Sequence, residues 1–316
     1  FIFLNVDFYP AFLISISLAF LAYPVSGTPF LDLHSSFFSL FAIYFAIFAI
    51  LKDKDFYWFF TSVFLCLAFF SKQVPAAYTI IGISLINLYF SINKKRGKIF
   101  IFYASGGIIF LILLFFFLIL KQIPIKDFIL QIFLFPQSIG SSRYDIYDLH
   151  FKNLILDFKF IHLVFFSMLF MNIFQLVKVK KYYNSKSFKV FLILSIFFVT
   201  TIFHQIYTKN QIYIFFLIPV LAGFALFYNN FTVTKYKKYI TYFILILCLF
   251  TTIKYNKRFN IERKFHELNY VDFKNIVDAK TIHKTFSGLN WITPNSLDKE
   301  KNLKEINNII KTQEHL

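Results

Sequence analysis

An uncharged apolar run occupies residues 99–120, with the sequence IFIFYASGGIIFLILLFFFLIL. A helix of this length matches the hydrocarbon core of a bilayer, which is roughly 30 Å thick. Lipid offers no partner for backbone N–H and C=O groups, so an isolated segment that crosses it must be helical. The whole chain of 316 residues is 58% hydrophobic, more than a soluble domain can cover with polar surface. The sequence therefore predicts an all-α integral membrane protein.

Apolar windows predict about nine transmembrane helices with short connections. They occupy residues 8–25, 35–51, 56–71, 74–92, 99–120, 154–176, 188–205, 211–228 and 238–253. No internal repeat of fixed period and no Walker loop, HExxH, GxSxG or CxxC motif is present.

The connections between these segments form two alternating sets that differ in charge. One set holds fourteen Lys and Arg residues, whereas the other holds six; the richer set consists of residues 52–55, 93–98, 177–189 and 229–238. Cytoplasmic connections retain positive charge, so we expect the richer set in the cytoplasm and the other on the exoplasmic side. The net charge of +17 mostly follows from this asymmetry and from a basic tail. It gives no reason to expect a nucleic-acid partner.

The chain is expected to comprise two parts. Residues 1–253 form the membrane domain, and residues 254–316 form a small soluble exoplasmic tail with an amphipathic helix in 299–312 and a turn at 287–296. The sequence begins at Phe1 without a Met or a signal-peptide pattern. We interpret it as a fragment that lacks its N-terminal part, with an incomplete tail. Cys66 and Cys248 lie in apolar runs and indicate neither a disulfide nor a zinc site.

Polar residues of mixed type gather on the expected exoplasmic side. The stretch SGTPFLDLHSS at residues 26–36 places Asp32 and His34 at the outer end of a predicted helix. A carboxylate there can act as a base, a hydrogen-bond acceptor or a metal ligand. Alternatively, Asp32 or Ser35 caps a helix that starts near residue 35. Both interpretations remain open.

Lys72 and Gln73 lie between two predicted helices that are joined by almost no loop. Ionisable residues at membrane depth are costly to bury and are candidate functional residues. An ammonium group here can bind phosphate, although Lys72 can also extend to the lipid headgroups. On the same side, His204 closes the seventh predicted helix and is either a site residue or a helix cap.

The long connection at residues 122–153 belongs to the same side. KDFILQIFLFP, at residues 126–136, is too short to span a bilayer and predicts an interfacial helix that ends at Pro136. The following loop contains Arg143, Tyr144 and Asp145. Arg suits bidentate phosphate contacts and Tyr suits stacking on a sugar, but a solvated loop with a local Arg–Asp pair is the alternative.

Two motifs in the first third of the chain resemble those of the GT-C glycosyltransferases, the polytopic enzymes that include protein O-mannosyltransferases and lipid A aminoarabinose transferases. Members carry a Pro-Asp pair before one helix and an LxxLTKGxP pattern before another. The matching residues here are Leu31-Asp32 and the stretch FFSKQVP at 69–75, with Leu31 in place of Pro and Gln73 in place of Gly. The likeness extends over residues 10 to 90.

The resemblance implies hexosyl or pentosyl transfer from a polyprenyl-phosphate donor to a glycan, lipid or protein acceptor. Its site and tail would face the periplasm at a bacterial inner membrane. Asp32 is the candidate catalytic residue, and the candidate substrate-binding residues are His34, Lys72, Gln73, Arg143, Tyr144, Asp145 and His204. The family's main catalytic acid lies in an earlier exoplasmic loop, which we expect upstream of Phe1. A divalent metal is left open as a cofactor, and membrane lipid is an expected partner.

Two other classes of protein remain as alternatives. A transporter or lipid flippase would carry charged or broken helices near the middle of the bilayer, often in two repeated halves. A non-catalytic membrane scaffold would use its tail to bind a partner. Substitution of Asp32 and Lys72 separates these classes, because an enzyme loses turnover at an unchanged membrane level and a scaffold tolerates both changes.

Overall fold

The computed structural model describes residues 1–22, 31–93, 96–141, 150–208, 214–231, 236–258, 276–281, 284–291, 305 and 308. The chain divides into two compact units, Phe1–Asn260 and Ile261–Leu316. The first unit continues beyond the expected boundary at residue 253 because its last helix extends to Asn256.

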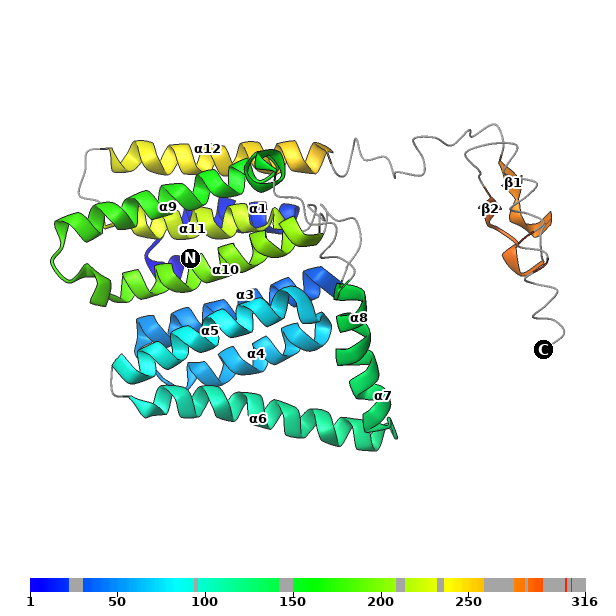
Figure 1. Cartoon of the computed structure of the whole chain (residues 1–316). Helices are drawn as coiled ribbons and strands as arrows, with labels where there is room; N and C mark the ends of the chain where they lie inside the picture. Colours follow the sequence, from blue (N-terminus) through cyan, green and yellow to red (C-terminus); the bar gives the residue numbers. More distant parts are fainter. Residues whose placement is uncertain are drawn as a thin grey trace. The chain divides into compact units, whose positions relative to one another are not determined.

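Apolar helices build the first unit (Figure 1). They are α1 (Phe8–Leu21), α3 (Leu31–Lys52), α4 (Tyr57–Ser71), α5 (Gln73–Asn93), α6 (Gly97–Leu120), α9 (Lys159–Lys178), α10 (Lys186–Thr208), α11 (Leu217–Asn229) and α12 (Lys237–Asn256). Short 3₁₀ or π turns lie at Ile2–Leu4, Lys152–Leu156 and Tyr182–Asn184.

Each of the nine predicted segments coincides with one of these helices. Six described helices are long and apolar enough to cross a membrane: α3, α5, α6, α9, α10 and α12. The other three, α1, α4 and α11, are apolar but have 14, 15 and 13 residues. The expectation of an α-helical polytopic membrane protein is therefore confirmed.

The helices pack in two groups. In the first group α3 packs on α4, and α4 packs on both α5 and α6. In the second group α11 packs against α9, α1 and α12. Every residue of α11 is buried, so this helix is apolar on all sides and enclosed by its neighbours. By contrast, α6 exposes most of its apolar surface, as expected of a helix that faces lipid.

The close packing of α6 on α4 at Gly106 explains why two glycines stand at the centre of α6. A Cβ atom at this position would lie 2.3 Å from the backbone carbonyl oxygen of Phe59 in α4. Small residues let membrane helices approach closely, and the pair here serves packing between two helices.

The basic connections lie together at one end of the bundle. Arg96 binds Asp53 and Asp55, so the connection after α5 meets the connection after α3. The Lys186 ammonium donates to the carbonyl of Leu51 (2.9 Å), which brings the start of α10 to the same place. Two further bonds add the connection after α11: Tyr228 to the Ser187 carbonyl, and Asn229 to the Lys237 carbonyl. We call this the basic end and the other the opposite end.

A helical segment runs across the opposite end of the bundle (Figure 1). It consists of α7 (Ile125–Ile129), a π-helical turn (Leu130–Leu134) and α8 (Phe135–Ser141). Phe128 and Phe133 contact the rings of Phe70 and Phe69 in α4. The prediction that Pro136 ends this helix was wrong. Proline lacks an N–H and crowds the preceding turn, and the wider π-helical turn before Pro136 accommodates both effects.

In the second unit, β1 (Val277–Asp278) pairs antiparallel with β2 (Asn290–Trp291). Short 3₁₀ turns occupy Ala279–Thr281 and Lys284–Phe286. The turn expected at 287–296 is partly correct: Gly288 has a positive φ of 89°, but Asn290 and Trp291 form a strand. The helix predicted for 299–312 lies outside the described residues except for Glu305 and Asn308.

Candidate functional site

Asp32 lies in the first turn of α3 and is 8% exposed. The helix begins at Leu31, earlier than the predicted start near residue 35. A carboxylate in the first turn is stabilised by the positive end of the helix dipole. Ser35 is inside the helix, and its hydroxyl donates to the carbonyl of Lys72 (3.2 Å). The expectation that Ser35 caps the helix was therefore wrong.

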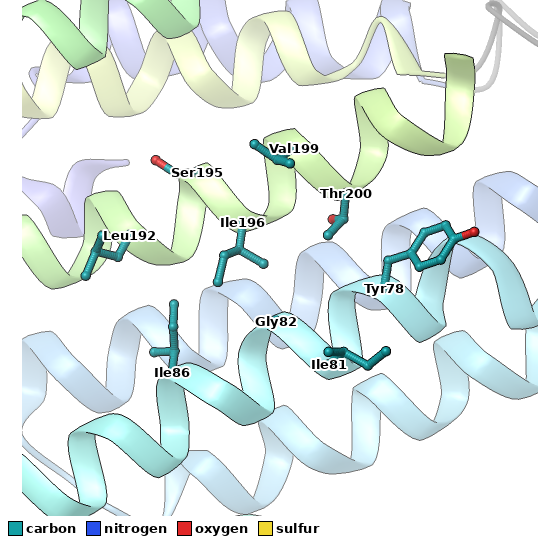
Figure 2. A pocket seen from close by; sticks show the side chains of 9 residues that line it. All are labelled: Tyr78, Ile81, Gly82, Ile86, Leu192, Ser195, Ile196, Val199 and Thr200. Atoms are coloured by element: carbon teal, nitrogen blue, oxygen red, sulfur yellow. The ribbon is translucent and has the colours of Figure 1, made fainter. Parts of the chain in front are cut away.

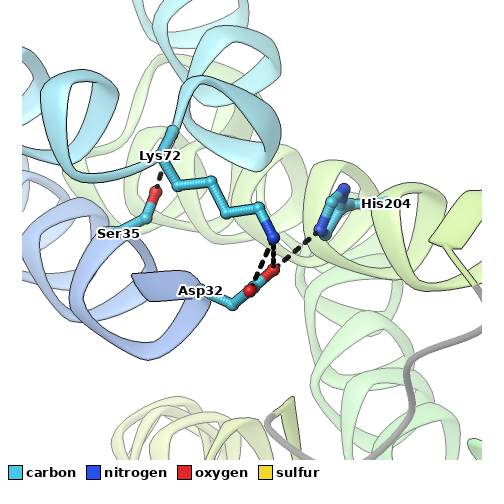
Figure 3. Close-up of polar contacts among 4 residues, drawn as sticks. All are labelled: Asp32, Ser35, Lys72 and His204. Atoms are coloured by element: carbon cyan, nitrogen blue, oxygen red, sulfur yellow. Dashed lines mark hydrogen bonds and ion pairs between the residues drawn. The ribbon is translucent and has the colours of Figure 1, made fainter. Parts of the chain in front are cut away.

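Lys72 is the residue at which α4 ends and α5 begins. Its backbone is extended (φ −159°, ψ 125°), which breaks the helix and turns the side chain toward α3. Its ammonium group lies 2.5 and 2.6 Å from the two carboxylate oxygens of Asp32 (Figure 3). The side chain is one-third exposed, so the ammonium binds the carboxylate at the rim of the bundle.

His204 reaches the same carboxylate from α10. Its Nε2 lies 3.5 Å from Oδ1 of Asp32, and the residue is 1% exposed (Figure 3). The carboxylate of Asp32 on α3 therefore faces two groups from other parts of the chain. They are the ammonium of Lys72, at the junction of α4 and α5, and the imidazole of His204 on α10. Next to His204, the amide of Gln205 is also buried, and neither its nitrogen nor its oxygen has a hydrogen-bond partner within the described part of the chain. Buried amides without partners are costly, which makes Gln205 a candidate for binding a polar ligand group.

The other predicted site residues lie elsewhere. His34 is two positions from Asp32, which places it on the other side of α3. There it lines an apolar cavity of 410 Å³ with Leu18 of α1 and with Phe37 and Phe41. Gln73 is half-buried at the start of α5, outside the contacts that join Asp32, Lys72 and His204. Three predicted residues lie outside the described part of the chain: Arg143, Tyr144 and Asp145.

An apolar groove of 510 Å³ separates α5 from α10 (Figure 2). Its walls include Tyr78, Ile81 and Ile86 from α5 and Leu192, Ile196 and Thr200 from α10. Gly82 lets α5 approach α10 closely at this point, because a Cβ atom there would lie 2.4 Å from the Cγ2 atom of Ile196.

The groove leads toward the polar cluster of Asp32, Lys72 and His204. Thr200 is one helical turn before His204 in α10, and its hydroxyl is 3.2 Å from that of Thr79 in α5. Tyr78 follows Lys72 along the first turns of α5. Sequence patterns did not reveal this groove because its two walls are more than a hundred positions apart. The apolar tail of a lipid in this groove would place a polar headgroup beside Lys72.

The cluster does not suit a divalent metal while its ion pair is formed. The Lys72 ammonium contacts both Asp32 oxygens and occupies the position that a cation would take. Within the described ranges, no three His, Cys, Asp or Glu side chains come together in a way that could hold a metal ion.

Comparison of the chain with protein-family models, with curated proteins and with solved structures finds no match. The class is therefore defined by the structure itself: a polytopic α-helical membrane protein with several helices long enough to span a bilayer. Within that class, its distinguishing feature is a carboxylate held between a lysine and a histidine at the opposite end of the bundle.

Proposed function

We propose that the chain is part of an integral membrane glycosyltransferase of the GT-C type. It transfers a hexosyl or pentosyl group from a polyprenyl-phosphate donor to a glycan, lipid or protein acceptor. The observation that carries this proposal is the arrangement of Asp32, Lys72 and His204 beside the outer part of an apolar groove. A lipid-linked sugar has the matching layout, with a long hydrocarbon tail, an anionic phosphate and a polar sugar in sequence.

Each polar residue has a role that follows from its chemistry. The Lys72 ammonium releases Asp32 and binds the donor phosphate, which gains negative charge when the bond between C1 of the sugar and the phosphate oxygen breaks. An acceptor hydroxyl oxygen forms the new bond to C1 and loses its proton to a carboxylate base. Asp32, freed from Lys72, accepts a hydrogen bond from the sugar or the acceptor, and His204 holds its orientation.

The groove between α5 and α10 takes the isoprenoid tail of the donor. Its lining is almost entirely hydrocarbon, and both helices are long and apolar enough to cross a membrane. The segment formed by α7 and α8 exposes Ile125, Leu134 and Phe135, which suits a position at the lipid interface next to the site. Support for an exoplasmic or periplasmic site comes from the four basic connections at the basic end, which favour a cytoplasmic position.

Binding of undecaprenyl phosphate to the purified full-length protein tests this proposal. Lys72→Gln should weaken binding about ten-fold, because it removes a charged hydrogen bond to phosphate. Leu192→Trp should weaken it by filling the groove from its half-buried wall on α10 while Lys72 stays intact. Lys121→Gln, which changes an exposed lysine at the opposite end, is the matched control and should bind normally.

Turnover with a panel of polyprenyl-linked sugars completes the test. Asp32→Asn should abolish transfer while the membrane level of the protein is unchanged. Normal transfer by Asp32→Asn, or normal lipid binding by both Lys72→Gln and Leu192→Trp, would contradict the proposal.

A transporter is the second candidate, and a specific observation favours it. Ser36 and Ser39 on α3 and Asn87 on α5 are buried, and their side chains have no hydrogen-bond partner within the described residues. They lie at increasing depth from Asp32, and Asn87 is about 21 Å along α5 from its first residue. Such a row can carry a proton or a small polar solute. Flux across proteoliposomes that needs no lipid-linked sugar and is lost in Asn87→Leu would favour the transporter over the enzyme.

A further inference from the structure

A second apolar groove separates α9 from α12 and is distinct from the groove between α5 and α10. Its volume is 460 Å³, and its walls include Phe170, Met171 and Phe174 of α9, Ile240 and Phe243 of α12, and Tyr236, which precedes α12. Phe170 is 71% exposed and Phe243 is 52% exposed, so the groove opens at the outside of the bundle. Both helices are long and apolar enough to cross a membrane, so the groove opens toward lipid.

Lysines flank the part of this groove that lies nearest the basic end. The ammonium of Lys178 lies 4.0 Å from the ring centroid of Phe174, which is itself a groove wall. Lys238 of α12 is two positions from Tyr236 and Ile240, which places it on the other side of that helix, where its ammonium lies 5.7 Å from the ring centroid of Tyr242. Three more exposed lysines follow close by in the chain, namely Lys180, Lys181 and Lys237.

Among the described residues, none of these five lysines forms an ion pair with a carboxylate. Between Asp157 and Glu262 the sequence contains no Asp or Glu. The two carboxylates that the structure places in the connection after α3, Asp53 and Asp55, are bound to Arg96. Lys178 therefore brings to the groove a positive charge that no carboxylate of the described residues neutralises.

We propose that this groove binds an anionic phospholipid of the leaflet at the basic end. One acyl chain lies between α9 and α12 against Phe170 and Phe243, and the phosphate contacts Lys178, while Lys238 adds to the positive charge at the same end of α12. The geometry matches a lipid, because Phe170 precedes Lys178 by two helical turns, which places the apolar part about 12 Å deeper in the bilayer than the charge. Basic pockets between membrane helices favour anionic over zwitterionic headgroups. The inference does not depend on the proposed transferase activity.

Fluorescence quenching by brominated lipids tests the proposal directly. The Phe174→Trp variant places an indole in the groove, and the unsubstituted chain, with Trp58 and Trp291, gives the background. The full chain is reconstituted in phosphatidylcholine vesicles that contain a small fraction of dibrominated phosphatidylglycerol or dibrominated phosphatidylcholine. We expect phosphatidylglycerol to quench the added indole preferentially, with an affinity ratio of about five-fold for each lysine engaged.

Charge substitutions at the two ends of the same helices separate the site from general attraction to anionic lipid. Lys178→Gln with Lys238→Gln should reduce the affinity ratio to about one. The matched control is Lys159→Gln with Lys254→Gln. These two lysines also pack on an aromatic ring, that of Phe160, and they belong to the same two helices. This control should keep the preference.

Three results would overturn the proposal. Equal quenching by the two brominated lipids would show that the headgroup is not recognised. A preference that persists in the Lys178 and Lys238 variant would place the binding elsewhere. An absence of quenching by both lipids would show that another protein surface, such as a second copy of the chain, covers the groove.

Discussion

The ammonium group of Lys72 lies 2.5 and 2.6 Å from the two carboxylate oxygens of Asp32, although the two residues belong to different helices. The two side chains differ in their access to water: the side chain of Asp32 is 11% exposed, whereas that of Lys72 is 33% exposed. Loss of Lys72 leaves a nearly buried carboxylate, whereas loss of the Asp32 charge leaves a long side chain that can turn toward the headgroups. The two substitutions should therefore have unequal costs.

We expect Lys72→Met to lower the free energy of unfolding by about 2 to 3 kcal/mol and Asp32→Asn by about 1 kcal/mol. Asp32→Asn in the Lys72→Met background should restore part of the loss, because it removes the unpaired carboxylate. Unfolding of the purified chain in detergent, followed by intrinsic fluorescence, measures the four states of this double-mutant cycle. Equal and additive losses would mean that the two charges do not stabilise each other.

The close contact between α6 and α4 predicts a second asymmetry, between two glycines of the same helix. A Cβ atom at Gly106 would lie 2.3 Å from the Phe59 carbonyl oxygen, whereas a Cβ atom at Gly97 meets nothing within 4 Å. Gly106→Ala should therefore destabilise the protein by about 1 to 3 kcal/mol through a forced backbone shift. Gly97→Ala should cause no loss, because alanine favours helix. Thermal unfolding in detergent distinguishes them, and equal midpoints for the two variants would contradict the packing described here.

The helices could be predicted from the sequence because bilayer thickness and hydrophobicity act on each segment by itself. All nine apolar segments are helical, and the contacts of Asp32, Lys72 and His204 place three predicted residues at one end of the bundle. The alternation of the connections was sufficient to predict that these three residues lie at the same end, because alternate connections between successive membrane-crossing helices lie on the same side of the membrane.

The sequence could not predict which side chains contact one another at the end of the bundle that holds Asp32, Lys72 and His204. His34 is close to Asp32 in sequence but lies on the other side of α3, and the residue pattern does not indicate that it lines an apolar cavity there with Leu18 of α1. The start of α3 was placed too late because Asp32 and Ser35 resemble helix caps, whereas tertiary contacts of Asp32 and Ser35 with Lys72 favour an earlier start. The continuation through Pro136 depends on a π-helical turn that no residue pattern indicates.

Arg96 predicts a modest, salt-sensitive contribution to stability. Its guanidinium donates to Asp53 at 2.7 Å and to Asp55 at 3.1 Å, and the hydrogen bond to Asp53 is the largest cause that raises the pKa of Arg96. Because the side chains of Arg96 and Asp53 are 36% and 50% exposed, Arg96→Gln should cost no more than about 1 kcal/mol, and less in high salt. Lys98→Gln, at an exposed neighbouring position, is the control. A cost of several kcal/mol that persists at high salt would contradict this expectation.

The direction of the pKa shift of Arg96, which is upward, also predicts how its contribution to stability depends on pH. Stability from a cation with a raised pKa is fully present below its unfolded pKa and is lost only as the pH rises through the folded value. For an arginine, that range lies above about pH 12. The difference in stability between the parent and Arg96→Gln should therefore not vary from about pH 6 to 9 through titration of the arginine. A difference that falls steadily across that range would assign the effect to another group.

The short helix α4 bears on the number of membrane crossings. It has 15 residues, which is about 22 Å of helix and less than the hydrocarbon core. Its two flanking connections nevertheless reach both ends of the longer α3. Asp55, just before α4, joins Arg96 at the basic end, and Lys72, just after it, joins Asp32 at the first turn of α3. If α3 crosses the bilayer, α4 must cross it too, with the polar residues at its ends covering the deficit.

Reporter fusions test this alternation along the chain. Fusions after residues 97, 185 and 235 lie in or beside three of the basic connections and should all report the cytoplasm. A fusion after Gln122, in the turn that follows α6, should report the exoplasmic side, as should one after Arg258, which follows α12. If α4 did not cross, a fusion after Lys54, in the connection between α3 and α4, would report the compartment opposite to that of the fusion after residue 97. Agreement of all three basic fusions, with opposite results after Gln122 and Arg258, places Asp32, Lys72 and His204 on the exoplasmic side.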